Sequence, residues 1–309
     1  MTSVAHLPGD TGAPPQPLEE IKPRGRAVPY LLLLPGIAWL TLFFAVPMVF
    51  LVSQSLQTGS LEQGYTFTGH VGTYSDALKT FYPQLIRSFV YAGLATLFAF
   101  LIAYPLAYAI AFKSGPWKNI LLVLVIAPFF TSFLIRTLAW QTILSGTGPV
   151  VSFFNKTGLI QVLQWLHLVN SDQLLNTPFA VVMGLTYNFL PFMTLPLYAS
   201  LERIDLRLLE AGGDLYASPF TAFRKVTFPL SLPGVVAGTL LTFIPAAGDY
   251  INSKLLGNTN TTMIGQVIDG QFLRVLDYPT AAALSVILMV SILVLVMIYV
   301  RRAGTEDLV

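Results

Sequence analysis

The amino-acid sequence predicts an all-α polytopic membrane protein with six transmembrane helices. Only 10% of its 309 residues are charged, 54% are hydrophobic, and the mean hydropathy is +0.68, which excludes an ordinary soluble globular chain. Six apolar runs reach the ~20 residues that a helix needs to cross a bilayer. They cover residues 29–52, 88–112, 118–144, 177–198, 230–251 and 280–300.

The distribution of basic residues predicts the orientation of the chain. Six spans place both termini on the same side of the membrane. The chain segments on that side hold eleven lysines and arginines, and those on the opposite side hold five. Because basic residues are retained on the cytoplasmic side, we expect both termini to be cytoplasmic. The eleven are Lys22, Arg24, Arg26, Lys113, Lys118, Arg203, Arg207, Arg224, Lys225, Arg301 and Arg302, and the five are Lys79, Arg87, Lys156, Lys254 and Arg274.

The two ends of the chain differ from its middle. Residues 1–28 contain proline, glycine and acidic residues without periodicity, which predicts a disordered cytoplasmic tail. Residues 303–309 form a second, short cytoplasmic tail. The transmembrane domain is expected to occupy residues 29–302.

Two outer loops contain signals for short helices. An apolar pattern around Leu159–Val169 predicts a helix on or near the membrane surface. A turn-rich stretch at residues 258–262 is expected to precede another short helix around Ile264–Leu273.

A polar segment at residues 201–229 separates the fourth and fifth apolar runs. Asp205 suits an N-cap, and Ser218 followed by Pro219 is a start signal for a second helix. The first helix is therefore expected to end near Tyr216. The second helix is expected to bury one apolar side, formed by Phe220, Phe223 and Val226.

This segment also contains small side chains at Ala211, Gly212 and Gly213. Small residues allow another backbone to approach closely. The segment therefore predicts a helix–turn–helix on the cytoplasmic membrane surface that fits the groove of a partner.

The segment resembles the cytoplasmic loop of the inner-membrane permeases of ATP-driven (ABC) importers. That loop has the pattern Glu-Ala-Ala, three residues, Gly, nine residues, then Ile-x-Leu-Pro; this chain has Glu210-Ala211-Gly212, Tyr216, Val226 and Phe228-Pro229 at the same spacing. Tyr216 is the main departure: if that position needs a positive φ, a bulky side chain costs about 1–2 kcal/mol there and the turn differs from the family's. The resemblance implies that one set of residues contacts the ATPase: Glu210, Ala211, Gly212, Asp214, Tyr216, Ala217, Ser218 and Pro219.

Outside the loop, the chain is similar to the permeases of polyamine (spermidine/putrescine) importers. The similarity rests on Phe243-Ile244-Pro245-Ala246, Gly248-Asp249, Leu255-Leu256-Gly257 and Met263-Ile264-Gly265, and extends over about residues 29–300. The resemblance implies a bacterial inner-membrane subunit that forms half of a translocation path. It also implies the partners: a second, different permease, a dimer of ATPase subunits and an extracytoplasmic solute-binding protein.

The chain has no sequence signature of an enzyme. It lacks cysteine and a GxxxxGK[ST] phosphate loop, and His6, His70 and His167 are not at metal-ligand spacing. We therefore expect no catalytic residue, metal or cofactor on this chain, and no nucleic-acid partner. The resemblance implies that ATP and magnesium bind to the partner ATPase.

Two charged residues lie inside predicted spans, where a functional role is the default hypothesis. Arg136 lies in the third span and Asp249 late in the fifth, both toward the outer side. One interpretation is that they pair with each other; another is that Arg136 snorkels to the interface. A third places Asp249 on the path of a cationic solute, assisted by Tyr250 through cation–π attraction.

Two other functions remain open from the residues. The chain could be an ABC permease for another small solute, because close relatives of the polyamine permeases carry other solutes. An ion-coupled secondary transporter would need no ATPase-binding loop but should have ion ligands at mid-membrane, for which Asp249 alone gives little support.

Overall fold

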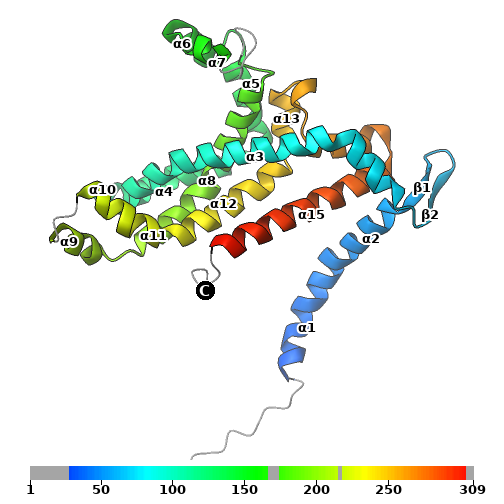
Figure 1. The fold of residues 1–309 in the computed structure, drawn as a ribbon, viewed down its shortest axis with the longest axis horizontal. Coiled ribbons are helices and arrows are strands. Elements are labelled where there is room, and N and C mark those ends of the chain that lie inside the picture. Colours follow the sequence, from blue (N-terminus) through cyan, green and yellow to red (C-terminus); the bar gives the residue numbers. More distant parts are fainter. Residues whose placement is uncertain (1–27, 166–173, 215–217, 304–309) are drawn as a thin grey trace, which may run out of the picture. The chain divides into compact units, whose positions relative to one another are not determined.

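A computed structural model describes residues 28–165, 174–214 and 218–303 of the chain (Figure 1). The described part consists of helices and one two-stranded hairpin. The chain divides into two compact units, residues 1–49 and 50–309. The first unit holds α1 (Val28–Leu40) and a π-helical turn, η1 (Thr41–Ala45), which continues into α2 (Val46–Ser55).

Four helices of the described part are long and apolar enough to cross a membrane, and six spans result if each of two bent pairs counts as one. The four single helices are Leu31–Ser55, α3 (Gly72–Phe112), α8 (Pro178–Glu202) and α15 (Tyr278–Ala303). The expected six-span fold class is confirmed. The second span is longer than predicted, because α3 begins at Gly72 rather than near residue 88.

The first bent pair falls where a single span was predicted, whereas the second joins the predicted cytoplasmic loop to the predicted fifth span. The third span consists of η2 (Gly115–Trp117), α4 (Lys118–Ile126) and η3 (Ala127–Phe130), followed after a 95° bend by α5 (Phe133–Leu144). The bend arises because Thr131 and Ser132 have extended ψ angles of 141° and 137°, which interrupt the helix. The fifth span is α12 (Leu232–Ala247), which is bent by 62° from the helical segment before it.

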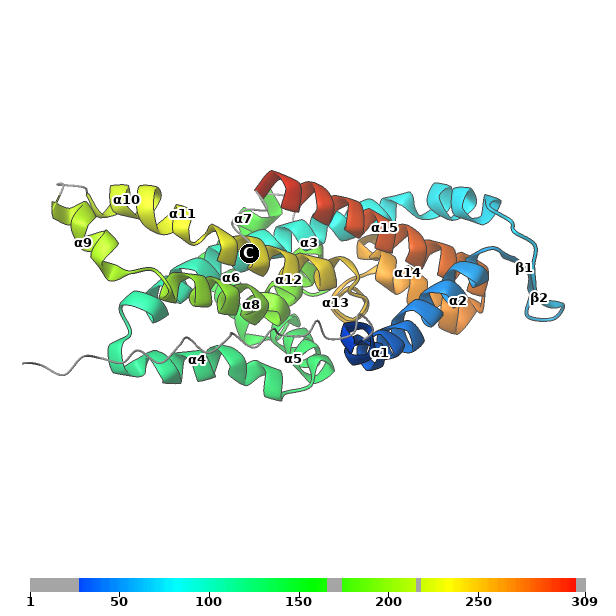
Figure 2. The same cartoon turned by 90° about the horizontal axis from the view of Figure 1, so that it is seen from below.

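The helices α3, α8, α12 and α15 lie side by side and form the core of the second unit (Figures 1 and 2). Helix α3 faces α8 with a stripe of small side chains at spacings of three and four residues. The fully buried members of this stripe are Ala92, Ala95, Ala99, Ala103 and Ala107. Small residues let membrane helices pack closely where lipid offers no competing hydrophobic force.

Shorter elements follow the ends of the spans on the predicted outer side. The strands β1 (Gln57–Ser60) and β2 (Gly64–Phe67) pair antiparallel, with Gln57 opposite Phe67. The other short elements are α6 (Pro149–Thr157), α7 (Leu159–Trp165), α13 (Ile251–Leu256), η5 (Thr259–Thr261), α14 (Ile264–Gly270) and η6 (Gln271–Val275).

The predicted outer helices have mixed outcomes. The helix expected around Ile264–Leu273 is present as α14 and η6. The helix expected around Leu159–Val169 is α7 as far as Trp165, and its remainder lies outside the described residues, as do nearly all of both predicted tails. The hairpin and α6 were not predicted.

Candidate functional site

The cytoplasmic loop predicted from residues 201–229 is a pair of helical arms. The first arm is α9 (Leu206–Asp214); Asp205 caps it, because its Oδ1 accepts the backbone N–H of Arg207 at 2.9 Å. The second arm consists of α10 (Pro219–Ala222), a π-helical turn η4 (Phe223–Thr227) and α11 (Phe228–Leu230). The Ser218 hydroxyl caps the second arm by accepting the backbone N–H of Thr221 at 3.3 Å. Both predicted caps are confirmed.

The residues expected to contact an ATPase lie on both arms and between them. Glu210 and Asp214 are exposed on α9, whose backbone also includes Ala211 and Gly212. Ser218 and Pro219 are exposed where α10 begins. Tyr216 and Ala217 lie outside the described residues.

The prediction that the second arm buries Phe220 is wrong. Its side chain is 71% exposed, whereas the Phe223 ring packs on Tyr104 and Tyr108 at centroid distances of 5.6 and 6.2 Å. Phe223 and Phe228 occupy the side of the arm that packs against the core around Tyr104. Phe220 therefore stays on the free surface together with Leu206 and Leu208.

Two polar contacts, in addition to the packing of Phe223, attach the loop to the spans. The Tyr104 hydroxyl on α3 hydrogen bonds to the Ser231 hydroxyl at 2.8 Å, at the 62° bend between α11 and α12. Lys118 at the start of α4 forms a 2.6 Å ion pair with Glu202 at the end of α8. Neither contact was predicted, because each joins residues more than 80 positions apart.

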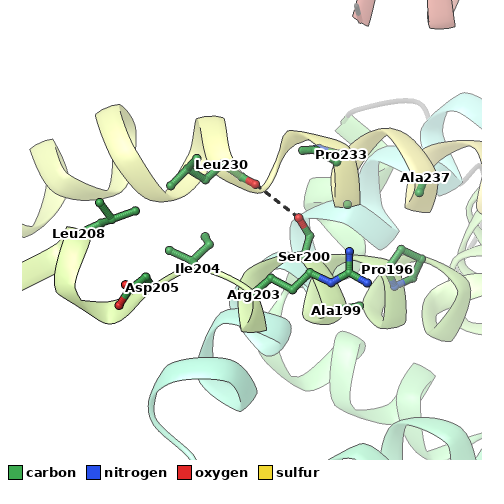
Figure 3. Close-up of a pocket in the computed structure, with 11 residues that line it drawn as sticks. Pro196, Ala199, Ser200, Arg203, Ile204, Asp205, Leu208, Leu230, Pro233 and Ala237 are labelled. Carbon is green, nitrogen blue, oxygen red and sulfur yellow. Dashed lines mark hydrogen bonds between the residues drawn. The ribbon is translucent and has the colours of Figure 1, made fainter. Parts of the chain in front are cut away.

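A groove of about 650 Å³ lies at the base of the loop, between the end of α8 and the start of α12 (Figure 3). Most of its lining is apolar, and its charged side chains are Arg203 and Asp205. The hydrogen bond from the Ser200 hydroxyl to the Leu230 carbonyl, at 3.5 Å, crosses one edge. The remaining lining residues are Pro196, Ala199, Ile204, Leu208, Pro233, Gly234 and Ala237.

The structure separates the two charges predicted inside the membrane. The ion pairs of the described part are Lys118–Glu202 and Lys254–Asp269, so the predicted pairing of Arg136 with Asp249 is wrong. Asp249 is 8% exposed in the break between α12 and α13, where its Oδ1 accepts the backbone N–H of Asn252 at 2.8 Å. This capping bond, and not a guanidinium, satisfies that oxygen.

Arg136 and Tyr250 have separate surroundings. The Arg136 side chain is 7% exposed, which rules out snorkelling to the surface within this chain, and its guanidinium lies over the rings of Phe129 and Phe133. Tyr250 is 42% exposed, and the ammonium group of Lys254 lies 5.9 Å from its ring centroid.

A buried polar junction near these residues was missed by sequence reasoning. The Asn188 side-chain amide on α8 donates to the Thr137 hydroxyl on α5 at 3.2 Å and to the side-chain Oδ1 of Asn252 on α13 at 3.0 Å. All three side chains are at most 1% exposed. An asparagine inside an apolar span was the available signal, because polar side chains join helices in membranes. No group of three or more potential metal ligands occurs in the described ranges.

Comparison with solved structures identifies the fold. Two structures of a bacterial ABC transporter that imports the acidic polysaccharide alginate, one in complex with a pentasaccharide-bound periplasmic protein, match with TM-scores of 0.65 and 0.66. They cover 89% and 90% of this chain and 94% of their own, at 20% and 19% identity. No protein-family model matches the chain. The fold is that of a membrane-spanning permease subunit of an ABC transporter.

Sequence relatives identify the family. The spermidine/putrescine transport system permease protein PotB of Haemophilus influenzae is 34% identical over 265 residues, which is 85% of this chain and 90% of the relative. PotB of Escherichia coli is 34% identical over 269 residues, covering 86% and 94%. The inner membrane ABC transporter permease protein YdcU of Escherichia coli is 31% identical over 73% of each chain. The chain belongs to the PotB family of permease subunits of ABC importers, as its loop and fifth-span motifs indicated.

Proposed function

We propose that this chain is the permease subunit of an importer of spermidine, putrescine or a related polyamine. The observation that supports this most is the 34–35% identity, over 85–86% of the chain, to permeases of spermidine/putrescine transport systems. The chain forms half of the translocation path, and a second, different permease forms the other half. Both termini lie in the cytoplasm of a bacterial cell, and the spans lie in its inner membrane.

The path runs along one face of α8 and α12. The groove residues Pro196 and Ala237 continue outward, at helical spacing, to the exposed side chains of Phe192 and Leu241. A polar solute must not meet lipid, so this face is covered by the second permease. At the outer end, Tyr250, Asp249 and Arg136 are the polar groups that a cationic solute meets first.

The cytoplasmic loop is the ATPase contact. Its free surface combines the apolar side chains of Leu206, Leu208 and Phe220 with the carboxylate of Glu210, a mixture suited to a groove in a protein partner. Two ATPase subunits bind ATP and magnesium, and an extracytoplasmic binding protein delivers the solute. When ATP draws the ATPases together, the loop moves, and the Tyr104–Ser231 bond passes this movement to α3 and α12.

Uptake of radiolabelled putrescine and spermidine tests the proposal. Cells that lack their own polyamine importers should accumulate both compounds when they express the complete operon, and should lose uptake when only this chain is deleted. An intact, assembled importer without polyamine uptake would contradict the solute assignment. Competition by unlabelled amines and neutral solutes would then identify another substrate. The name of the relative YdcU specifies no solute.

A further inference from the structure

Two phenylalanine rings lie against the buried guanidinium of Arg136, and two further rings pack on them. The guanidinium carbon lies 5.7 Å from the Phe129 ring centroid and 5.6 Å from that of Phe133. Phe129 packs on Phe192 at 5.0 Å, and Phe133 packs on Phe189 at 6.0 Å. We call these four rings, from η3, α5 and α8, the aromatic cage.

No carboxylate pairs with Arg136 in the described part of the chain. The Nε and Nη1 atoms of Arg136 are buried and have no hydrogen-bond partner among the described residues. The carboxylates of Glu202 and Asp269, which form the ion pairs of the described part, are paired with lysines instead. A buried guanidinium without an anion is costly in a membrane protein. Arg136 is therefore held much less firmly than a paired arginine, and its exchange with another cation is not opposed by a salt bridge.

The cage spans the sharp break in the third span. Phe129 precedes the extended residues Thr131 and Ser132, and Phe133 follows them, so the two principal rings belong to helices that meet at 95°. A change in this bend moves one ring relative to the other. The cage can therefore open without unfolding either helix.

The cage adjoins the face proposed as the translocation path. Phe192 is 37% exposed and precedes the groove residue Pro196 by one helical turn of α8. A solute that moves along this face passes the cage rim.

We infer that the aromatic cage is a binding site for the ammonium groups of the transported solute, and that Arg136 is its built-in competitor. This inference rests on the proposed polyamine substrate. Aromatic faces attract ammonium and guanidinium groups by the same quadrupole interaction. Two positive charges cannot share the cage, so an ammonium group enters only when the guanidinium leaves, and Arg136 closes the site again after the solute has passed.

Thiol protection tests this inference directly. The Arg136→Cys variant removes the guanidinium from the cage and introduces a thiol there. Because the chain has no native cysteine, this thiol is the only one in it. Alkylation of the thiol in the assembled importer is measured by mass spectrometry of the peptide that contains position 136. Putrescine should slow alkylation by about fivefold, within the range expected for cation–π binding. Butane-1,4-diol, of the same length but uncharged, should not. Thr142→Cys, exposed on the same helix, should label equally under all conditions.

The outcomes separate this inference from the proposed function. No protection by putrescine, or equal protection by the diol, overturns the cage even if the wild-type importer takes up polyamines. If the wild-type importer takes up no polyamine, the proposed substrate is rejected. Protection by putrescine in the Arg136→Cys variant would then still support the cage as a site for ammonium groups.

Ring substitutions provide the second measurement if the Arg136→Cys variant does not assemble. With saturating loaded binding protein, Phe133→Leu should lower maximal polyamine uptake by about 2- to 30-fold, and Phe133→Tyr should retain it. Phe89→Leu is the matched control, because that ring stacks on Phe243 and not on a cation. Equal loss in the leucine and tyrosine variants, or no loss with leucine, overturns the inference.

Discussion

At the scale of single residues, two glycines set the distance between α8 and α12. A Cβ atom at Gly234 would lie 2.5 Å from the Ser200 Cβ and 2.7 Å from the Pro196 carbonyl oxygen. At Gly238 it would lie 2.8 Å from the Met193 sulfur. The two glycines form a GxxxG pattern, the usual signal for close helix pairs in membranes.

Gly234→Val should therefore separate α8 from α12 and destabilise the protein by about 1–3 kcal/mol, as expected for overpacking. The measurement is the temperature at which half of the detergent-solubilised protein loses its monodisperse peak in size-exclusion chromatography. Gly93→Ala is the control, because no atom lies within 4 Å of a Cβ there. Equal melting of the two variants would show that close contact at Gly234 does not limit stability.

The Asp249 side chain carries a negative charge and also accepts the backbone N–H of Asn252, and substitutions can separate these two roles. Asp249→Asn keeps an oxygen that can accept the Asn252 N–H but removes the negative charge, so polyamine uptake should fall while the amount of folded complex is preserved. Asp249→Ala should also lower the amount of folded complex, because it leaves the buried Asn252 N–H without its acceptor, at a cost of about 1–3 kcal/mol. Normal uptake by the asparagine variant would leave Asp249 with a structural role alone.

At the scale of elements, local signals were sufficient for the caps of the cytoplasmic loop but not for its surroundings. Asp205 and Ser218 cap helices because each acts on N–H groups only two or three residues away. Phe220 was placed wrongly because its burial depends on where α3 ends, which helical spacing does not reveal. The same limit explains the incorrect pairing of Arg136 with Asp249.

The loop arms make a specific prediction about coupling. Gly212→Trp places a large side chain on α9, within the proposed contact, and should prevent co-purification with the ATPase while the chain remains inserted in the membrane. Glu210→Ala, on the exposed side of the same helix, should weaken the contact by about 1.5–3 kcal/mol if a charge-assisted hydrogen bond is lost. Normal co-purification and uptake in the Gly212→Trp variant would reject this loop as the ATPase contact.

At the scale of the whole molecule, composition predicted the number of spans but not their breaks. The bend at Thr131 depends on the backbone conformation of two residues inside a run whose mean hydropathy is that of one continuous span, so hydropathy gave no sign of it. Similarly, α3 extends to Gly72 because its outer part packs on α14 and α15 and need not be apolar throughout.

The absence of cysteine makes the orientation testable. Single cysteines introduced at positions predicted to be cytoplasmic should resist an impermeant thiol reagent in intact cells. Single cysteines at positions predicted to lie outside should react with it. Labelling of the Ser218→Cys variant from outside would reverse both the orientation and the coupling scheme. The protected positions are Ser3, Ser218 and Thr305, and the reactive ones are Ser60, Asn155 and Asn258.

The length of α3 has a mechanical consequence. Its 41 residues follow a helical path about 60 Å long, twice the ~30 Å hydrocarbon thickness, with Pro83 and Pro105 inside the helix. Near its inner end Tyr104 holds Ser231 beside the cytoplasmic loop, and in its outer half Arg87 donates to the Thr262 carbonyl at 2.9 Å. A tilt of about 10° would displace the far end of a helix of this length by about 10 Å. Under the proposed coupling scheme, α3 acts as a lever arm, long enough to convert a small displacement at one end into a large one at the other.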